Sequence, residues 1–226
     1  MNIDTLFDRR IALPEMEVMQ RYHRLVGLDE TKTRLEKILG LLVNPSAVED
    51  WQEKFHPIAD NLLDTVLRRP PLIVLAGDVG TGKTELGETI GDAVARKFDI
   101  NMMVYPLSLS TRGSGRVGEM TQLISEAFSV VHEEARRLKT STGRAKGGLI
   151  LLIDEADALA QSREDSQMHH EDRAGVNALL RGIDRLAEAN LPAAVIMCTN
   201  RWAAIDPAIQ RRACEVVQFT RPNSDQ

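Results

Sequence analysis

The 226-residue chain has little cysteine and few aromatic residues. Its two cysteines, Cys198 and Cys214, are too few for a disulfide framework or a four-ligand zinc site, so we expect a reducing, cytoplasmic setting. Aromatic residues make up 4% of the chain, which disfavours a stacking platform for single-stranded nucleic acid. No apolar run approaches the ~18 residues of a membrane span, and the start, MNIDTLFDRR, lacks the apolar segment of a signal peptide. We therefore expect no membrane attachment.

Positive charge is also in deficit. The chain has 28 Lys and Arg against 33 Asp and Glu, a net charge of −5, which argues against nucleic acid as the principal partner. Hydrophobic residues make up 43% and charged residues 27%, as in an ordinary globular protein with a sizeable core. This length and composition predict one domain, or slightly more than one.

Short apolar runs alternate with segments of helical periodicity. The runs are PLIVLAG, NMMVYPLSL, GGLILLIDE, AAVIMCTN and EVVQFT. Continuous rather than alternating apolar character predicts strands that are buried on both faces, as in a parallel sheet. Apolar residues recur at helical spacing in four segments, which begin near Leu28, Lys83, Gly118 and Asp172. The sequence therefore predicts an α/β fold with a five-stranded parallel sheet covered by helices, preceded by an extended lead-in.

Residues 77–84, GDVGTGKT, match the phosphate-loop pattern G-x-x-x-x-G-K-[ST] between a predicted strand and a predicted helix. In such a loop the backbone N–H groups surround the phosphates, and the helix dipole favours the anion. Lys83 is expected to reach the β- and γ-phosphates, and the Thr84 hydroxyl is a candidate Mg²⁺ ligand. The predicted nucleotide contacts here are Asp78, Val79, Gly80, Thr81, Gly82, Lys83, Thr84 and Glu85.

The run LILLIDE ends in two carboxylates, Asp154 and Glu155. The carboxyl end of a buried strand faces the crevice where α/β sheets bind ligands. Asp154 is the candidate Mg²⁺ ligand, and Glu155 is placed to polarise a water for attack on the γ-phosphate. A helix cap is the alternative interpretation of such a pair, and the phosphate loop earlier in the chain disfavours it.

Two further features follow the next apolar run. Asn200 ends that run, where an amide can orient the attacking water or touch the γ-phosphate; a turn or cap is the alternative. Arg211 and Arg212 follow the short segment IDPAIQ. They either form a solvated face, or one of them reaches a neighbouring subunit's nucleotide and stabilises the charge of the transition state.

The motifs GDVGTGKT, LLIDEAD, TN and IDPAIQRR, in this order, resemble those of an AAA+ ATPase. The resemblance implies a P-loop NTPase large subdomain over residues 23–221, with residues 1–22 as its lead-in. It also implies that HRLVGL cups the adenine with backbone around Val26 and Gly27. In this family a small helical lid follows, and residues 222–226 stand where its linker begins. We expect the lid to be missing here, either because the chain is truncated or partly ordered or because closure comes from elsewhere.

Within AAA+, the chain looks most similar to the pachytene-checkpoint and thyroid-receptor-interactor branch, which remodels HORMA-domain proteins. Bacterial relatives accompany HORMA proteins in anti-phage operons. The resemblance implies Mg²⁺-dependent ATP hydrolysis by a hexamer that engages its partner in a central pore and converts it from closed to open. It places Arg212 on the trans-acting arginine, with Arg211 as second choice.

The segment aligned with the family's pore loop contains Arg116, Val117 and Gly118. Arg116 stands where an aromatic residue is usual. Its long stem can still pack on a peptide, and an acidic peptide becomes a plausible preference; a solvated loop without a substrate role is the alternative. For the whole chain, the alternative function is a nucleic-acid-associated AAA+ ATPase of the initiator or clamp-loader type.

Overall fold

The computed structural model describes residues 6–44, 46–57, 69–109, 118–139, 145–159 and 170–221. Its centre is a six-stranded sheet with the order β1-β3-β4-β5-β2-β6. The strands are β1 (Ile11–Leu13), β2 (Leu72–Gly77), β3 (Asn101–Ser108), β4 (Gly147–Asp154), β5 (Ala193–Thr199) and β6 (Ala213–Phe219). Strands β2 to β6 run parallel to one another, and β1 pairs antiparallel with β3. The predicted parallel five-stranded sheet is confirmed, with β1 added at one edge.

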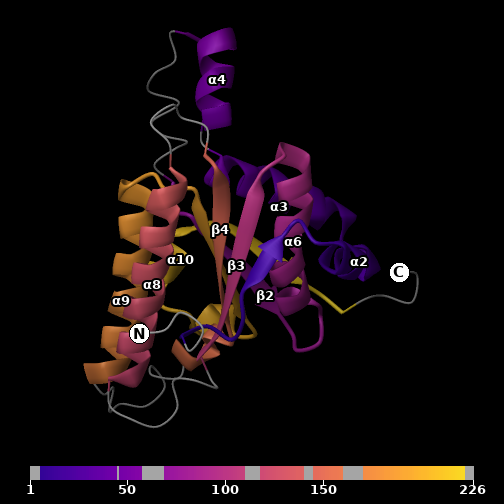
Figure 1. The fold of residues 1–226 in the computed structure, drawn as a ribbon. Helices are drawn as coiled ribbons and strands as arrows, with labels where there is room; N and C mark the ends of the chain where they lie inside the picture. Colours follow the sequence, from indigo (N-terminus) through magenta and orange to yellow (C-terminus); the bar gives the residue numbers. More distant parts are fainter. Residues whose placement is uncertain are drawn as a thin grey trace.

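Helices connect the strands and cover both faces of the sheet. They are α2 (Met16–Arg24), α3 (Asp29–Val43), α4 (Ser46–Phe55), α6 (Lys83–Phe98), α8 (Glu119–Leu138), α9 (His170–Glu188) and α10 (Pro207–Gln210), with 3-10 turns η1 (Ala156–Leu159) and η3 (Trp202–Ala204). Figure 1 shows α8 and α9 on one face of the sheet and α3, α6 and α2 on the other. This three-layer arrangement is the one that alternating strands and helices favour.

Strand β2 shows how the two faces share the core. Leu72, Val74 and Ala76 belong to the apolar cluster under α8 and α9, whereas Ile73 and Leu75 belong to the cluster under α3 and α6. These side chains are fully buried. Successive side chains of a strand point to opposite faces, so burial on both faces requires the continuous apolar run that the sequence shows.

The N-terminal segment is not the extended lead-in that the sequence predicts. Ile11–Leu13 forms β1, and Met16–Arg24 forms α2, which packs against α6. Only Val18 and Tyr22 of α2 are buried. Two apolar contacts one turn apart give too weak a periodic signal to indicate a helix.

Helix α4 stands apart from the sheet, at the top of Figure 1, and exposes Trp51 and Phe55. Their rings lie 6.2 Å apart, between centroids. Within the ranges that the structure describes, no helix is both long enough and apolar enough to cross a membrane.

Helices α8 and α9 pack closely because α9 has no side chain at Gly182. A Cβ built there would overlap the ring of Phe128 on α8. About two turns earlier, Gly175 also lies on α9, but a Cβ built there would only reach ordinary contact with Leu159 and Met120, at 3.5 Å. The two glycines therefore have different structural roles in the same helix.

We expect Gly182→Ala to lower the free energy of unfolding by about 1–3 kcal/mol, because the added methyl group overpacks the α8–α9 contact. Gly175→Ala is the matched control. It should be neutral, or stabilise by up to about 1 kcal/mol through helix propensity. Urea denaturation of both variants measures the difference, and equal effects of the two substitutions would contradict this account of Gly182.

Candidate active site

Three neighbouring strands bring the predicted site residues to one edge of the sheet. Strands β4, β5 and β2 are adjacent and parallel, with Ile153 opposite Met197 and Thr199 opposite Ala76. Their carboxyl ends therefore lie at the same edge, where parallel sheets bind ligands. The phosphate loop, the two carboxylates and Asn200 each follow one of these ends.

The phosphate loop has the conformation of an anion cradle. Gly80 and Gly82 have φ values of 78° and 91°, a backbone region that favours glycine. Gly82 is the N-cap residue of α6 and makes no side-chain cap bond, so it leaves the first N–H groups of the helix open to a ligand. The Lys83 ammonium group donates to the carbonyl oxygens of Gly77 and Asp78 at 2.8 and 2.6 Å. This geometry fits a phosphate chain above the helix N-terminus.

The buried thiol of Cys198, on β5, interacts with both predicted metal ligands. Burial raises the pKa of this thiol; the Asp154 charge raises it further, whereas the Lys83 charge and the Thr84 hydroxyl lower it. The same thiol is therefore within interaction range of all three residues. A hydroxyl and a carboxylate beside the phosphate cradle are the oxygen donors that Mg²⁺ prefers, so the residues present fit this ion.

Glu155 has an unusual backbone and a fixed carboxylate. Its φ of 54° is rare for a residue with a side chain, and its N–H group donates to Asp154 Oδ1 at 2.8 Å. The Ser108 hydroxyl, at the end of β3, donates to Glu155 Oε2 at 2.8 Å. Strain of this kind concentrates at functional sites, and the Ser108 hydrogen bond holds this exposed carboxylate beside the end of β3.

Asp157, in η1, is a site residue that the sequence analysis missed. Its carboxylate accepts hydrogen bonds from the Thr199 hydroxyl at 2.6 Å and from the backbone N–H groups of Asn200 and Arg201 at 3.1 and 3.0 Å. One side chain thus links the segment after Glu155 to the segment that carries Asn200. The available signal was a third carboxylate two residues beyond Glu155.

The segment between α2 and α3 reaches the phosphate loop. A Cβ built on Gly82 would lie 3.3 Å from Leu25 Cδ2. Next to Leu25, the Val26 side chain is 65% exposed and Gly27 has a φ of 72°. The segment expected to cup the adenine therefore lies beside the expected phosphate cradle, with an unburied apolar side chain.

Glu85 was grouped with the nucleotide contacts, yet its carboxylate binds another side chain of the same chain, that of Arg21. Arg21 donates to it from Nε at 2.8 Å and from Nη2 at 2.7 Å. This guanidinium lowers the pKa of Glu85 despite partial burial. With the carboxylate held in this way, the backbone is the part of Glu85 that remains for a phosphate.

Arg211 and Arg212 lie away from this edge. They precede β6, whereas the phosphate loop follows β2, and the two strands are parallel. The arginines therefore stand at the amino-terminal end of the strands, opposite the end that carries the phosphate loop. Arg212 donates to both carboxylate oxygens of Asp184 on α9, at 2.7 and 2.8 Å, and this contact raises its pKa. Arg211 is exposed.

Other predicted positions are only partly visible. Arg116 and Val117 of the pore segment and residues 222–226 lie outside the described residues. Gly118 is described; it has a φ of 83° and immediately precedes α8.

Comparisons with known proteins agree with this architecture. A chain in the solved structure of the E. coli MS115-1 HORMA:CdnC:Trip13 complex is 64% identical; it matches with a TM-score of 0.91 over 100% of this chain and 74% of that chain. The structure of Rhizobiales Trip13 matches with 49% identity and a TM-score of 0.74, over 96% of this chain and 70% of that chain.

A curated relative is the CD-NTase-associated protein 6 of Escherichia coli strain MS 115-1. It is 66% identical over 225 residues, which cover 100% of this chain and 72% of the relative. Residues 73–221, from β2 to just beyond β6, match the family described as "ATPase family associated with various cellular activities (AAA)". The chain therefore belongs to the AAA family of ATPases.

Proposed function

We propose that this AAA ATPase hydrolyses Mg²⁺-ATP at interfaces between its subunits and uses the cycle to remodel a HORMA-domain protein in bacterial anti-phage defence. The observation that carries the proposal is the match, at a TM-score of 0.91 over 100% of this chain and 74% of the other, to a chain from a complex that contains HORMA and CdnC proteins. The phosphate loop, the acidic strand end, Asn200 and one arginine of the pair Arg211 and Arg212 supply the residues that such a cycle needs. Both cysteines are free thiols, which fits a reducing cytoplasm.

Nucleotide binding uses the residues at the ends of β2 and β4. The loop N–H groups and Lys83 bind the phosphates, and Lys83 exchanges its bonds to the loop carbonyls for bonds to phosphate oxygens. Thr84 and Asp154 would hold Mg²⁺, which, when bound, neutralises charge on the β- and γ-phosphates. Val26 and Gly27 would contact the base.

Hydrolysis uses the neighbouring strand ends. Glu155 accepts a proton from the attacking water, after its carboxylate leaves the Ser108 hydroxyl. Asn200 orients that water or the γ-phosphate, and Asp157 fixes the backbone from which Asn200 projects. Of the acidic groups at the strand ends, Glu155 therefore acts as the base and Asp157 positions Asn200.

Completion of the site requires a second subunit. Arg212 lies at the opposite edge of its own sheet, so it serves a neighbour's triphosphate rather than its own. Asp184 holds its guanidinium in one orientation through two hydrogen bonds, whereas Arg211 has no comparable fixed geometry among the contacts of the described residues. Arg212 is therefore our first choice for trans action, in a ring that we propose to be a hexamer.

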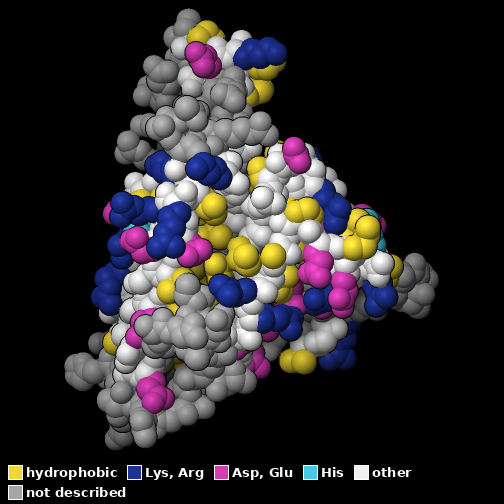
Figure 2. Space-filling model, in the orientation of Figure 1, with side chains coloured by type: hydrophobic (Ala, Val, Ile, Leu, Met, Phe, Trp, Pro, Cys, Tyr) yellow, Lys and Arg dark blue, Asp and Glu magenta, His cyan; other side chains and the backbone are white. Residues whose placement is uncertain are grey.

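A protein partner suits the surface better than nucleic acid does. Figure 2 shows basic and acidic side chains intermixed on the face that it displays. On α8, the basic side chains of Arg136 and Arg137 lie beside Glu133 and Glu134. We propose that Arg116, Val117 and Gly118 line the pore that engages the HORMA protein.

We expect Glu155→Gln to bind ATP with unchanged affinity but to hydrolyse it about a hundredfold more slowly or worse, because the amide cannot accept the water's proton. Full-length Glu155→Gln with ATP should also retain the HORMA protein of the same operon through gel filtration. Binding and phosphate-release assays measure the first effect, and co-elution measures the second.

Lys83→Ala is the control for that experiment. It should abolish ATP binding, and with it the nucleotide-dependent retention of the partner. Wild-type turnover by Glu155→Gln would remove Glu155 from the role of base. Hydrolysis without any ATP-dependent HORMA binding would leave the ATPase but contradict the remodelling function.

We expect Asp157→Ala to lower kcat by about tenfold or more while the Kd for ATP stays constant, because Asn200 loses the carboxylate that fixes its backbone. The kcat of Asp157→Asn should lie between those of Asp157→Ala and the wild type, since the remaining carbonyl oxygen can still accept hydrogen bonds from Thr199 and Asn200. Steady-state kinetics below the melting temperature measure kcat, and unchanged kcat in both variants would exclude this positioning role.

We expect Arg212→Ala to lower kcat by about a thousandfold, because transition-state charge goes unneutralised. Mixing it with Glu155→Gln subunits should restore activity, since those subunits supply the arginine to intact Glu155 sites. Arg211→Ala is the matched control and should remain active alone. Mixed rings that show no recovery would argue against trans action by Arg212.

A further inference from the structure

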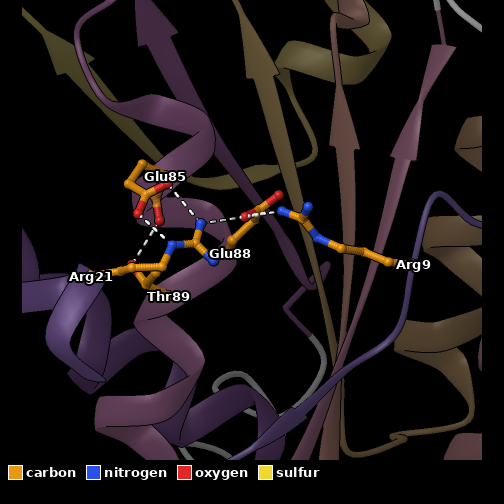
Figure 3. A network of polar contacts seen from close by, with 5 residues as sticks. All are labelled: Arg9, Arg21, Glu85, Glu88 and Thr89. Carbon is orange, nitrogen blue, oxygen red and sulfur yellow. Dashed lines mark hydrogen bonds and ion pairs between the residues drawn. The ribbon is translucent and has the colours of Figure 1, made fainter. Parts of the chain in front are cut away.

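Three carboxylates on one face of α6 attach the N-terminal segment to the helix that follows the phosphate loop. Glu85, Glu88 and Asp92 are spaced by three and four residues, so they share a face. Arg21 on α2 bonds Glu85 with two hydrogen bonds and reaches Glu88 Oε2 at 2.7 Å; Figure 3 shows this guanidinium directed from α2 toward α6. We call Arg21, Glu85 and Glu88 the Arg21 clamp.

The start of α2 is attached to the same helix. The backbone N–H of Glu15 donates to Asp92 Oδ1 at 2.7 Å, and Asp92 is also paired with Arg96. Because α2 is bonded near both of its ends, its position relative to α6 is defined along its whole length. Any segment that continues directly from α2 inherits this position.

The segment that continues from α2 begins at Leu25. The Leu25 carbonyl oxygen accepts a hydrogen bond from Lys32 Nζ of α3 at 2.5 Å, and this ammonium lies 4.5 Å from the centroid of the Tyr22 ring. Lys32 is only 7% exposed, so the hydrogen bond is largely shielded from water. Val26 and Gly27 thus follow a backbone carbonyl that α3 holds from one side while the Arg21 clamp holds α2 from the other.

We propose that Arg21 is a positioning residue for base recognition: it fixes Val26 and Gly27 against the phosphate loop, so that base and triphosphate are bound as one unit. The proposal rests on the nucleotide site proposed above. Glu85 directly follows Thr84, so the clamp joins the base-binding segment to the residue beside the expected metal ligand. This connection fixes how closely Leu25 approaches Gly82, where a built Cβ would lie 3.3 Å from Leu25 Cδ2.

The clamp can be opened without leaving Glu88 alone. Glu88 is 6% exposed and keeps its ion pair with Arg9 when Arg21 is replaced (Figure 3). The Glu85 side chain is 39% exposed and can return to water. Removal of Arg21 therefore strands no buried charge, and the fold should survive.

The test compares ATP with inorganic triphosphate, which has the phosphates but no base. For full-chain Arg21→Gln, calorimetry should give an ATP affinity about tenfold lower and a triphosphate affinity unchanged within about twofold. Arg21→Lys, which keeps the charge but not the bidentate geometry, should recover part of the loss. Arg137→Gln is the matched control: it removes the Arg137–Glu134 ion pair of 3.2 Å on α8, whose side chains are not buried, and should change neither affinity.

Equal losses for both ligands, or no loss for either, would overturn the proposal, because a merely structural effect does not distinguish them. Lys32→Met acts on the same segment from α3 and should reproduce the selective loss if Arg21→Gln does not fold. A wild-type protein that binds triphosphate as tightly as ATP would also overturn it, with the phosphate site intact. A wild-type protein that binds neither ligand would instead refute the proposed function itself.

Discussion

The close approach of α6 to the sheet is the constraint on which the site depends. A Cβ on Gly87 would collide with Leu152 of β4, and one on Gly91 would press against Leu13 and Ile150. These two positions let the helix axis lie near the strands, so that its first turn, with Lys83 and Thr84, begins directly over the strand ends. Larger side chains there would push the helix outward and separate the phosphate cradle from the carboxylates of β4.

The same helix serves as an attachment point for the N-terminal segment. Its sheet-facing side is apolar and small, whereas the side that faces α2 carries the carboxylates that pair with Arg9 and Arg21. The positions of the phosphate loop, the carboxyl ends of the strands and the base-binding segment are thereby all fixed relative to α6. A second rigid connection, through Asp157, relates the end of β4 to the end of β5. Two short polar links thus align groups that come from four separate parts of the chain.

Much of this arrangement could be predicted from the sequence. Strands that are buried on both faces give continuous apolar runs, which predict the parallel sheet. The spacing of glycine, lysine and threonine in GDVGTGKT is specific to phosphate loops, so it predicts the phosphate cradle. Asp154, Glu155 and Asn200 could be placed because each ends such a run. Their common edge follows from parallel strands alone.

The missed features are contacts between residues distant in sequence. The bond from Ser108 to Glu155 spans 47 positions and that from Asp157 to Thr199 spans 42, and neither has a local pattern. Glu85 was grouped with the phosphate contacts because of its neighbours, whereas its side chain is directed by Arg21, 64 residues earlier. Helix α2 escaped notice because polar contacts with α6, rather than an apolar stripe, hold much of it in place.

The charge state of the Arg21 clamp sets how it responds to acid. Hydrogen bonding to Glu85 and then Glu88 raises the pKa of Arg21, so this guanidinium stays charged throughout the range in which proteins fold. Arg21 in turn lowers the pKa of Glu85 from its ordinary value of 4.5. The stabilisation from this pair is fully present above that ordinary value and fades only as the pH falls through the lowered one. Changes of pH around neutrality therefore leave the Arg21–Glu85 pair charged, and strong acidification weakens this pair.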